Sequence, residues 1–193
     1  EDAADKMADL QVLKKIEVLG IDKTDFYTPE YNWKAIYNES LVAVKDALDF
    51  DETVEFNGTT ASELNAFLEG RSQVRVEVTA AELTLDETID VPSDVWLSGT
   101  DTALTGDGED NVTYGILIED AGHAAVSGMQ LKSGFDYGIY IINSNQVLIR
   151  DNEVANAALK GICVMDANTQ INLINNSVHD NGNGAIFFNG EIT

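Results

Sequence analysis

The chain of 193 residues carries 34 Asp and Glu against 11 Lys and Arg, a formal net charge of −23 at pH 7. This balance argues against nucleic acid or an anionic membrane surface as a partner, because each phosphate contact needs a cation. No segment is long and apolar enough to span a membrane, and the single Cys163 rules out an internal disulfide. We therefore expect no nucleic-acid partner, no membrane insertion, and a fold that is stabilised by its core.

The N-terminal part contains two stretches with apolar side chains at helical spacing. One covers residues 3–19 and is followed by Gly20, a residue that often stands just after a helix. The other covers residues 40–50. The pattern predicts an N-terminal helical segment over residues 1–50 and a second domain over residues 51–193.

A third helix is predicted near residues 61–69, where the second domain begins. Thr60, followed three residues later by Glu63, matches a capping box, and the apolar Leu64 and Leu68 come next. The helix leads directly into a β-rich stretch. Because the first strands of a stack expose backbone groups and core side chains, we expect this helix to cover them.

From residue 114 onward an apolar phrase returns every 23 residues, marked by Gly115, Gly138, Gly161 and Gly184. A fixed period in the range of about 20 to 50 residues is typical of stacked repeats. Each repeat holds short alternating β runs separated by Gly, Asn and Asp, and none has an apolar stretch of helical length. The sequence therefore predicts an all-β, single-stranded β-solenoid with 23 residues per rung.

Equivalent positions of successive rungs form columns, and apolar columns that alternate along the chain should point into the core. These columns are Ile116/Ile139/Ile162/Ala185, Ile118/Ile141/Val164/Phe187, Ala124/Val147/Ile171, Val126/Ile149/Leu173 and Leu131/Val154/Val178. Asn and Asp tolerate left-handed backbone and are expected to stack at the turns. The polar columns are Asn152/Asn176, predicted to form an Asn ladder, and Asp120/Asn143/Asp166/Asn189.

Two further columns should point outward although they are mostly apolar. They are Leu117/Tyr140/Cys163/Ile186 and Glu119/Ile142/Met165/Phe188. A soluble monomer seldom leaves such a patch uncovered. We expect residues 1–50 to cover it, and the alternative is a contact surface for sugar rings or for a protein partner.

The entry segment, residues 74–99, contains VRVEV, LTL and IDVPSDVWLSG, and the rungs follow it. This part of the chain resembles the right-handed parallel β-helix proteins of the pectin-lyase-like superfamily, which includes polysaccharide lyases, mannuronan C5-epimerases and NosD-type repeat proteins. Residues 176–182 are similar to a segment of the epimerases, whose catalytic Asp-Pro-His-Glu motif is not matched by residues 165–168. The resemblance implies a right-handed parallel β-helix that is secreted or lies at the cell surface and acts on carbohydrate.

Catalysis on a uronate polymer needs a base, an acid and a cation beside the substrate carboxylate. The candidates are His179, Asp180 and Lys160. The alternative is that His179 and Asp180 belong to a polar turn between rungs. The candidate substrate-binding residues are Tyr137, Tyr140 and Arg150.

An acidic loop is the candidate metal site. Asp107, Glu109 and Asp110 offer several oxygen ligands for Ca²⁺, although the loop lacks the frame of an EF-hand. Ca²⁺ would also let an acidic protein hold an acidic sugar, which the net charge otherwise repels. The alternative is a solvated acidic loop.

We expect a carbohydrate-active protein: the N-terminal part of a polysaccharide-processing β-helix (lyase, epimerase or hydrolase) or a polysaccharide-binding β-helix. An enzyme of this kind would be a lyase or epimerase acting on a uronate polymer. The alternative is a non-catalytic structural or adhesive β-solenoid of a surface or appendage protein. The last phrase, residues 184–190, has no closing limb. We therefore expect further rungs to follow residue 193, or another chain to cover the open C-terminal rung.

Overall fold

The structure, a computed structural model, describes residues 50, 52–108, 111–166 and 168–189. These residues belong to a unit that begins at Phe50. The two helices predicted within residues 1–50, and their predicted coverage of the outward apolar columns, lie outside the described residues.

The described strands pair in parallel and form three stacks, two of which are joined because the long strands β5 and β7 bend from one into the other. Stack 1 contains β1 (Glu52–Phe56), β2 (Val74–Val78), the first halves of β5 (Val95–Gly106) and β7 (Gly122–Leu131), β9 (Asn145–Arg150) and β12 (Thr169–Ile174). Stack 2 contains β3 (Glu82–Leu85), the second halves of β5 and β7, β10 (Glu153–Ala155) and β13 (Ser177–His179). Stack 3 contains β4 (Ile89–Asp90), β6 (Val112–Glu119), β8 (Phe135–Ile142), β11 (Lys160–Met165) and β14 (Ile186–Asn189).

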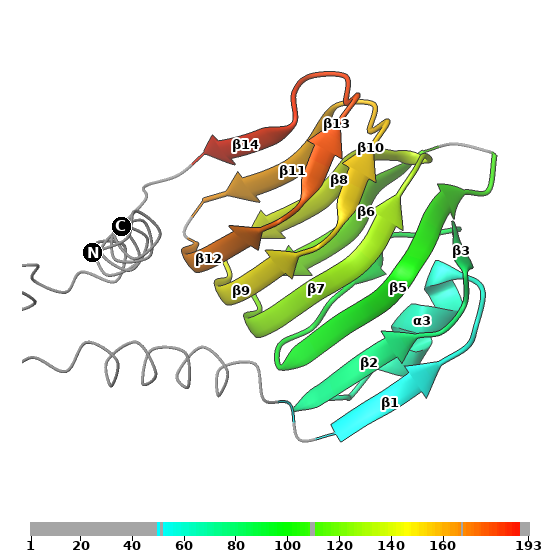
Figure 1. Ribbon diagram of the computed structural model, residues 1–193. Coiled ribbons are helices and arrows are strands. Elements are labelled where there is room, and N and C mark those ends of the chain that lie inside the picture. Colours follow the sequence, from blue (N-terminus) through cyan, green and yellow to red (C-terminus); the bar gives the residue numbers. More distant parts are fainter. Residues whose placement is uncertain (1–49, 51, 109–110, 167, 190–193) are drawn as a thin grey trace, which may run out of the picture. The chain divides into compact units, whose positions relative to one another are not determined.

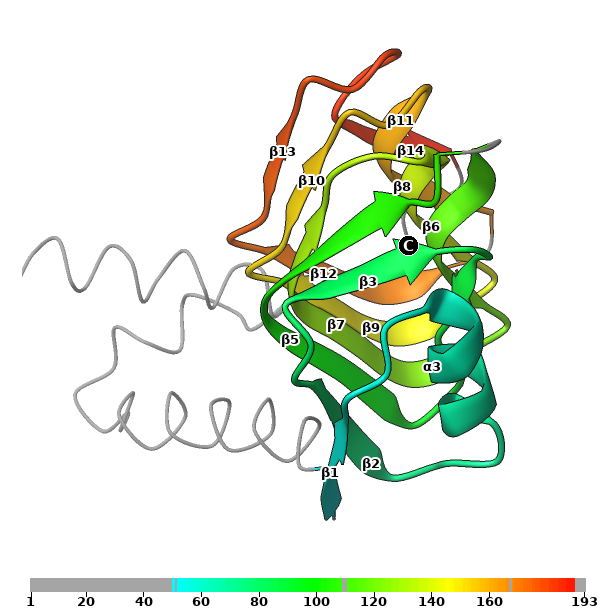
Figure 2. The same ribbon diagram turned by 90° about the vertical axis from the view of Figure 1, so that its right-hand side faces the viewer.

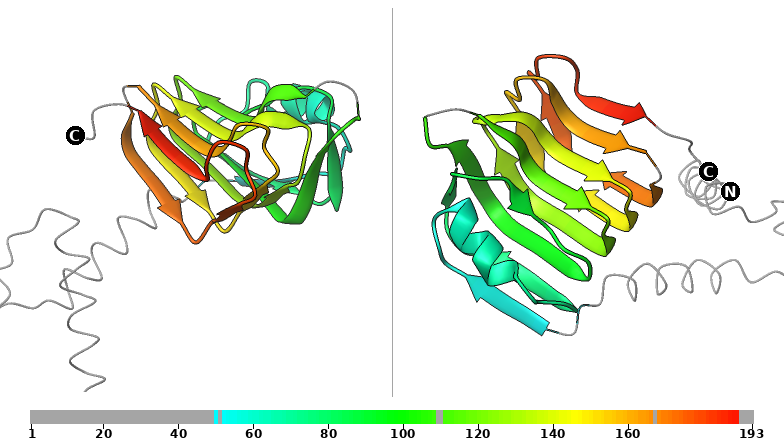
Figure 3. Two further views of the ribbon diagram at one scale, coloured as in Figure 1. Left: turned by 90° about the horizontal axis from the view of Figure 1, so that it is seen from above. Right: turned by 180° about the vertical axis from the view of Figure 1, so that it is seen from behind.

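Each rung contributes one strand segment to each stack and then climbs to the next rung. Figure 1 shows the strands of stack 1 side by side, and the right-hand view of Figure 3 shows those of stack 3 from behind. Ile116, Ile139 and Ile162 are directly paired across stack 3, so the chain advances by the predicted repeat length from one rung to the next. The predicted parallel β-solenoid and its rung length are therefore confirmed.

The core lies inside the three stacks and is built from the predicted inward columns. Ile116, Ile139 and Ile162 have no exposed surface, and neither do Val147 and Ile149. Residues of one column are one strand spacing apart, about 4.8 Å, so equal side chains stack on one another from rung to rung. The columns of stacks 1 and 2 also keep the predicted partners throughout.

The last rung differs from the prediction by one residue. Ile162 pairs with Ile186 and not with Ala185, so this step is one residue longer than the repeat. The same longer step separates Val147 from Ile171, so the extra residue enters before β12 and is kept through the rung. Gly184, with φ +119°, lies in the turn before β14 and is not the counterpart of the earlier strand glycines.

This shift reassigns the columns of stack 3 at its C-terminal end. Ile186 and Phe188 extend the inward columns in place of the predicted Ala185 and Phe187. Phe187 extends the outward column of Tyr140 and Cys163, where Ile186 was predicted. The shift places the larger of the two candidate side chains, Ile186, on the core side of the rung.

Helix α3 (Ala61–Leu68) covers the first rungs, as predicted. The Thr60 hydroxyl accepts a hydrogen bond from the Glu63 backbone N–H at 3.2 Å, and the Glu63 carboxylate accepts one from Thr59 N–H at 2.8 Å. Leu64 and Leu68 are buried in the same core as the strands. Figure 2 shows α3 beside β3, at the end of the molecule where β1 and β2 lie.

Strand β1 was not predicted. It pairs with β2 along its whole length and adds a strand to stack 1 before the chain enters α3. The ring of Phe56 at its end packs against Phe67 of the helix, with 5.3 Å between ring centroids. The first rung is therefore covered both by a strand and by a helix.

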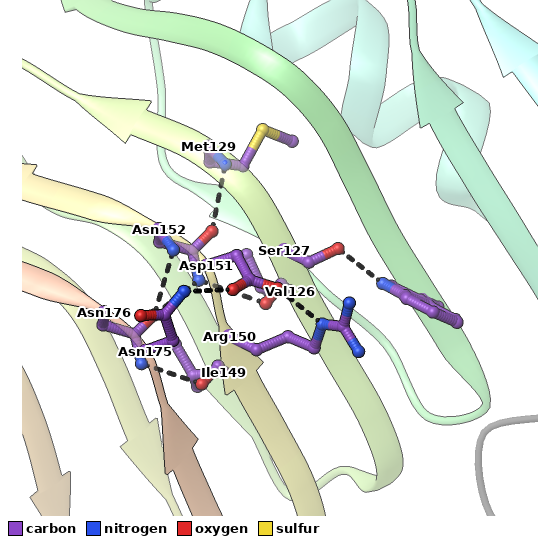
Figure 4. A network of polar contacts seen from close by, with 10 residues as sticks. Val126, Ser127, Met129, Ile149, Arg150, Asp151, Asn152, Asn175 and Asn176 are labelled. Carbon is purple, nitrogen blue, oxygen red and sulfur yellow. Dashed lines mark hydrogen bonds and ion pairs between the residues drawn. The ribbon is translucent and has the colours of Figure 1, made fainter. Parts of the chain in front are cut away.

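The predicted Asn ladder holds the corner between stacks 1 and 2. The Asn152 side chain accepts a hydrogen bond from Met129 N–H at 3.0 Å and donates to Val126 O at 3.1 Å. Asn176 repeats this one rung later, accepting from Asn152 N–H at 3.1 Å and donating to Ile149 O at 2.8 Å. Figure 4 shows the two amides stacked and linked in this way. The ladder satisfies backbone groups that the bend would otherwise leave buried and unpaired.

The other polar column marks the corner after stack 3. Asp120, Asn143 and Asp166 have φ values of 50°, 50° and 60°, the left-handed conformation that was expected of them. Asn189, the fourth predicted member of this column, pairs instead with Met165 because of the longer last step. Just beyond them, Ser144 and Asn168 form a second short ladder, in which Asn168 accepts from Ser144 N–H at 2.8 Å. The rung is thus bent by side-chain amides at two corners.

Candidate functional site: a tyrosine face on stack 3

Three tyrosines form a contact cluster on the outer face of stack 3, which we call the tyrosine face. The ring centroids of Tyr114 and Tyr140 are 4.4 Å apart, those of Tyr137 and Tyr140 are 5.4 Å apart, and those of Tyr114 and Tyr137 are 5.8 Å apart. All three side chains are half-buried. The cluster therefore presents a continuous aromatic surface that is already packed before any ligand arrives.

The strand register explains why these rings meet. Tyr114 pairs with Tyr137, and Leu117 pairs with Tyr140, so the rings come from neighbouring strands. Gly115 and Gly138 face the core residues Leu131 and Val154, which leaves the preceding Tyr114 and Tyr137 on the outside. Burial raises the pKa of Tyr140, and the neighbouring Tyr114 hydroxyl raises it further. The Tyr140 phenol therefore stays neutral at physiological pH and can both donate and accept hydrogen bonds.

Lys160 and Phe187 extend the tyrosine face toward β14. Lys160 pairs with Tyr137 in the strand register, and its Nζ lies 4.0 Å from the centroid of the Phe187 ring. Cys163 is buried in the same row, and burial raises the pKa of its thiol. This thiol is therefore protonated at neutral pH and is not an activated nucleophile.

His179 and Asp180, the predicted acid/base pair, lie on stack 2. His179 Nδ1 is 2.8 Å from an Asp180 carboxylate oxygen, and its Nε2 is 3.4 Å from Glu153 Oε1. The hydrogen bond to Asp180 is the largest cause of the raised pKa of His179, and the one to Glu153 adds to it. Glu153 is in turn held by Lys132 at 2.7 Å, which lowers the pKa of Glu153. Both ring nitrogens thus face carboxylates, an arrangement that suits an imidazolium ion.

The structure separates the predicted catalytic group. Lys160 belongs to β11 in stack 3, where its hydrogen bond goes to Asn183 O at 3.4 Å. Among the described residues it forms no hydrogen bond or ion pair with His179 or Asp180. The residues that lie beside His179 are Glu153, which contacts its ring, and Lys132, which contacts Glu153. Sequence reasoning missed both of them.

The predicted substrate-binding residues are also divided. Tyr137 and Tyr140 meet on stack 3, whereas Arg150 ends β9 in stack 1 and packs near Trp96. Tyr114 was missed as a member of the aromatic cluster. It stands one repeat length before Tyr137, so the repeat period alone could have identified it.

The predicted Ca²⁺ site is only partly described. Asp107 is exposed beside β5, while Glu109 and Asp110 lie outside the described residues. Within the described ranges, no group of three or more His, Cys, Asp or Glu side chains is arranged to hold a metal ion.

A pocket of about 580 Å³ opens between α3 and strands β4 and β6, and sequence reasoning did not anticipate it. Its wall includes the carboxylates Glu69, Glu87, Asp90 and Glu119. Loss of solvation in the wall raises the pKa of Asp90, and the charges of Glu87 and Glu119 raise it further. The pocket therefore repels anions, and its carboxylates come from different elements, which no local motif reveals.

Comparison with known protein families agrees with this architecture. Residues 97–192 match the family described as right-handed β-helix region. This part of the chain is similar to that family. The matched rungs contain the whole tyrosine face and the strands β10 and β13, which carry Glu153 and His179. The right-handed parallel β-helix inferred from the sequence resemblance is thereby confirmed. No curated protein and no solved structure matches the chain.

The helices of the structure bear on the prediction that the chain does not insert into a membrane. In the described part of the chain, no helix has the length and hydropathy of a membrane span. The short α3 is amphipathic and places its apolar residues in the β-helix core.

Proposed function

We propose that this β-helix is an extracellular polysaccharide-binding protein whose contact surface is the tyrosine face. The observation that carries the proposal is the cluster of Tyr114, Tyr137 and Tyr140, three rings in mutual contact on the outside of one parallel stack. The β-helix fold supports it as a scaffold shared with carbohydrate-active proteins. The stacking of rungs matters because it extends the same face along stack 3, from Tyr114 of β6 to Phe187 of β14.

The chemistry of the face suits a sugar chain. A pyranose ring has an apolar face of C–H groups that packs on an aromatic ring, and its hydroxyls bond with phenol groups at the edge of the contact. Tyrosine supplies a large contact area while losing little conformational entropy, and it is enriched at binding hot spots for that reason. Because the three rings already pack against each other, ordering them costs little on binding.

The proposal stops at binding because the groups needed for catalysis do not gather on this face. A lyase or epimerase needs a base, an acid and a cation around one sugar unit. His179 and Asp180 are on stack 2 and Lys160 is on stack 3. The thiol of Cys163 beside the tyrosines is buried and protonated.

The test is a binding assay against a panel of neutral and uronate oligosaccharides, with and without Ca²⁺. We expect Tyr140→Ala and Tyr114→Ala each to weaken binding by about tenfold or more, the usual effect of losing a hot-spot aromatic side chain. Tyr140→Phe keeps the ring and should retain most of the affinity. Gln130→Ala, a partly exposed side chain on stack 2, is the control that should change nothing.

Two results would overturn the proposal. One is that no member of the panel binds the wild-type protein. The other is that binding is unchanged in Tyr140→Ala and Tyr114→Ala while both variants keep the circular dichroism spectrum and unfolding transition of the wild type.

A second candidate function is a non-catalytic structural or adhesive solenoid. The observation that favours it is the set of large apolar side chains exposed on the last rung, Ile174 (52%), Ile186 (46%), Phe187 (36%) and Phe188 (51%). Edge strands of this kind pair readily with additional strands. A protein that assembled through this edge and bound no sugar would support the structural function over the first proposal.

A further inference from the structure

Stack 1 carries a cluster that the tyrosine face does not involve. Residues 50–193 contain only five Lys and Arg residues, Arg71, Arg75, Lys132, Arg150 and Lys160. Two of them converge on one ring: the guanidinium carbons of Arg75 and Arg150 lie 4.5 Å and 5.9 Å from the centroid of Trp96. We call Arg75, Trp96 and Arg150 the arginine–tryptophan cluster.

The strand register brings the cluster together from successive rungs. Arg75 of β2 pairs with Trp96 of β5, and Trp96 pairs with Ala125 of β7. Arg150 of β9 pairs with Ser127 of β7. The two arginines therefore approach the indole from strands on opposite sides of it, although they lie far apart in the sequence.

Small side chains make room for the indole. Ser98, Ala125 and Ser127 alternate outward with the core residues of stack 1, and each is buried. Ser127 Oγ accepts a hydrogen bond from the indole N–H of Trp96 at 2.8 Å. The ring is thus fixed at one edge, and the ring of Phe50 packs against it with 6.0 Å between the centroids.

Each guanidinium group is held through its inner nitrogen. Arg75 donates from Nε to Ser98 Oγ at 3.0 Å, and Arg150 donates from Nε to Asp151 Oδ2 at 2.8 Å. Figure 4 shows Arg150 extending from its strand, with Asp151 held in turn by Asn175. Among the described residues, neither arginine uses its terminal nitrogens in a hydrogen bond or ion pair. Both forks remain available as donors.

We propose that the arginine–tryptophan cluster is a binding site for an oxyanion, a carboxylate or sulfate group carried by an acidic saccharide. Guanidinium forks bind such groups through two parallel hydrogen bonds, and stacking on an aromatic ring orients the fork in advance. The site stands out because the surrounding protein is strongly acidic, so a polyanion is repelled except where two arginines face it. Asp151 and Glu77 border the cluster and restrict the anion to the side where the terminal nitrogens lie.

The saccharide as carrier rests on the proposed function, whereas the oxyanion chemistry rests on the cluster alone. The two sites use different stacks and different residues. A Tyr140→Ala variant should therefore lose binding at the tyrosine face and keep the response at the arginine–tryptophan cluster, so the two proposals can fail separately.

The experiment uses the fluorescence of Trp96. The chain has two tryptophans, Trp33 and Trp96, so a Trp33→Phe background leaves Trp96 as the only indole. The full-length protein is titrated with trigalacturonate, with its fully methyl-esterified form, with a sulfated trisaccharide and with tri-aspartate. We expect saturable changes in Trp96 emission with the uronate or the sulfated sugar, and none with the neutral ester.

Arginine variants assign the response to the two forks. Arg75→Met and Arg150→Met should each weaken binding at least about tenfold, the loss of one charge-assisted contact. Arg75→Lys and Arg150→Lys keep the charge without the fork and should lose most of the affinity as well. Arg71→Met is the matched control, because Arg71 packs on Phe67 and bonds to its carbonyl at 2.6 Å, away from the cluster.

The outcomes separate the alternatives. An equal response to the methyl ester, or unchanged binding in folded Arg75→Met and Arg150→Met proteins, would overturn the oxyanion site. An equal response to tri-aspartate would overturn the saccharide assignment. A response to uronate or sulfated sugar that the fork variants abolish and Arg71→Met preserves would support the proposal.

Discussion

The first and last rungs of this β-helix are built from similar side chains and have opposite surroundings. At the first, Leu64 and Leu68 of α3 close the core and β1 pairs with β2, and the leucines are almost completely buried. At the last, Ile186 and Phe188 occupy inward columns and are about half exposed. An inward position in a solenoid therefore buries a side chain only when a neighbour covers the rung, since each rung contacts only the rungs beside it.

The largest expected effect comes from a substitution in the buried first rung. Leu64→Ala should lower the free energy of unfolding by about 2–5 kcal/mol, because it removes buried methyl groups and leaves a cavity under the cap. Ile186→Ala should lower it by less than about 1 kcal/mol, because nearly half of that side chain already faces solvent. Chemical denaturation followed by circular dichroism measures both. Equal losses in the two variants would contradict the dependence of burial on neighbouring rungs.

The Asn ladder offers a matched pair of substitutions, and we expect their effects on the free energy of unfolding to be of intermediate size. Asn152→Ala leaves the buried N–H of Met129 without an acceptor and should lower the free energy of unfolding by about 1–3 kcal/mol. Asn176→Ala removes the same interaction one rung later, where the side chain is partly exposed and water can replace it. We expect a clearly smaller loss there. A larger loss for Asn176→Ala than for Asn152→Ala would show that the ladder is not strongest where it is buried.

The smallest effect concerns His179 of β13. Its pKa is raised in the folded protein by Asp180 and then Glu153, so its stabilising contribution is complete below the unfolded pKa of about 6.5 and is lost as pH rises through the folded value. His179→Gln should therefore lower the melting temperature more at about pH 5.5 than at about pH 8.5. A difference that grows with rising pH would contradict the assigned contacts.

The rung and its columns could be predicted from the sequence because they are local and repeated. The same residue type recurs at equivalent positions of successive rungs, which indicates the strand register. Examples are Ile116, Ile139 and Ile162 in the core, and Asn152 and Asn176 in the ladder. The last rung was misaligned because Gly184 continues the glycine spacing, although the chain had already taken up one more residue before β12. Columns with the longer step, such as Val147 and Ile171, carried the correct signal.

The candidate sites were harder to predict because they depend on which stack each residue joins. Tyr137 and Tyr140 stand in one strand, and their rings are in contact. Arg150 was grouped with them because it is close in the sequence, yet the chain turns a corner between β8 and β9 and places Arg150 on stack 1. Its neighbours Arg75 and Trp96 come from earlier rungs of irregular length. The step from Arg75 to Trp96 is shorter than the repeat and the step from Trp96 to its partner in β7 is longer, which hides the column.

The tyrosine face is tested most directly by a structure of the protein bound to an oligosaccharide that saturates it in solution. We expect a sugar ring packed on Tyr114, Tyr137 and Tyr140, with its hydroxyls within hydrogen-bonding distance of the phenol groups. Sugar bound only at other surfaces, with the tyrosine face left bare, would contradict the proposed function.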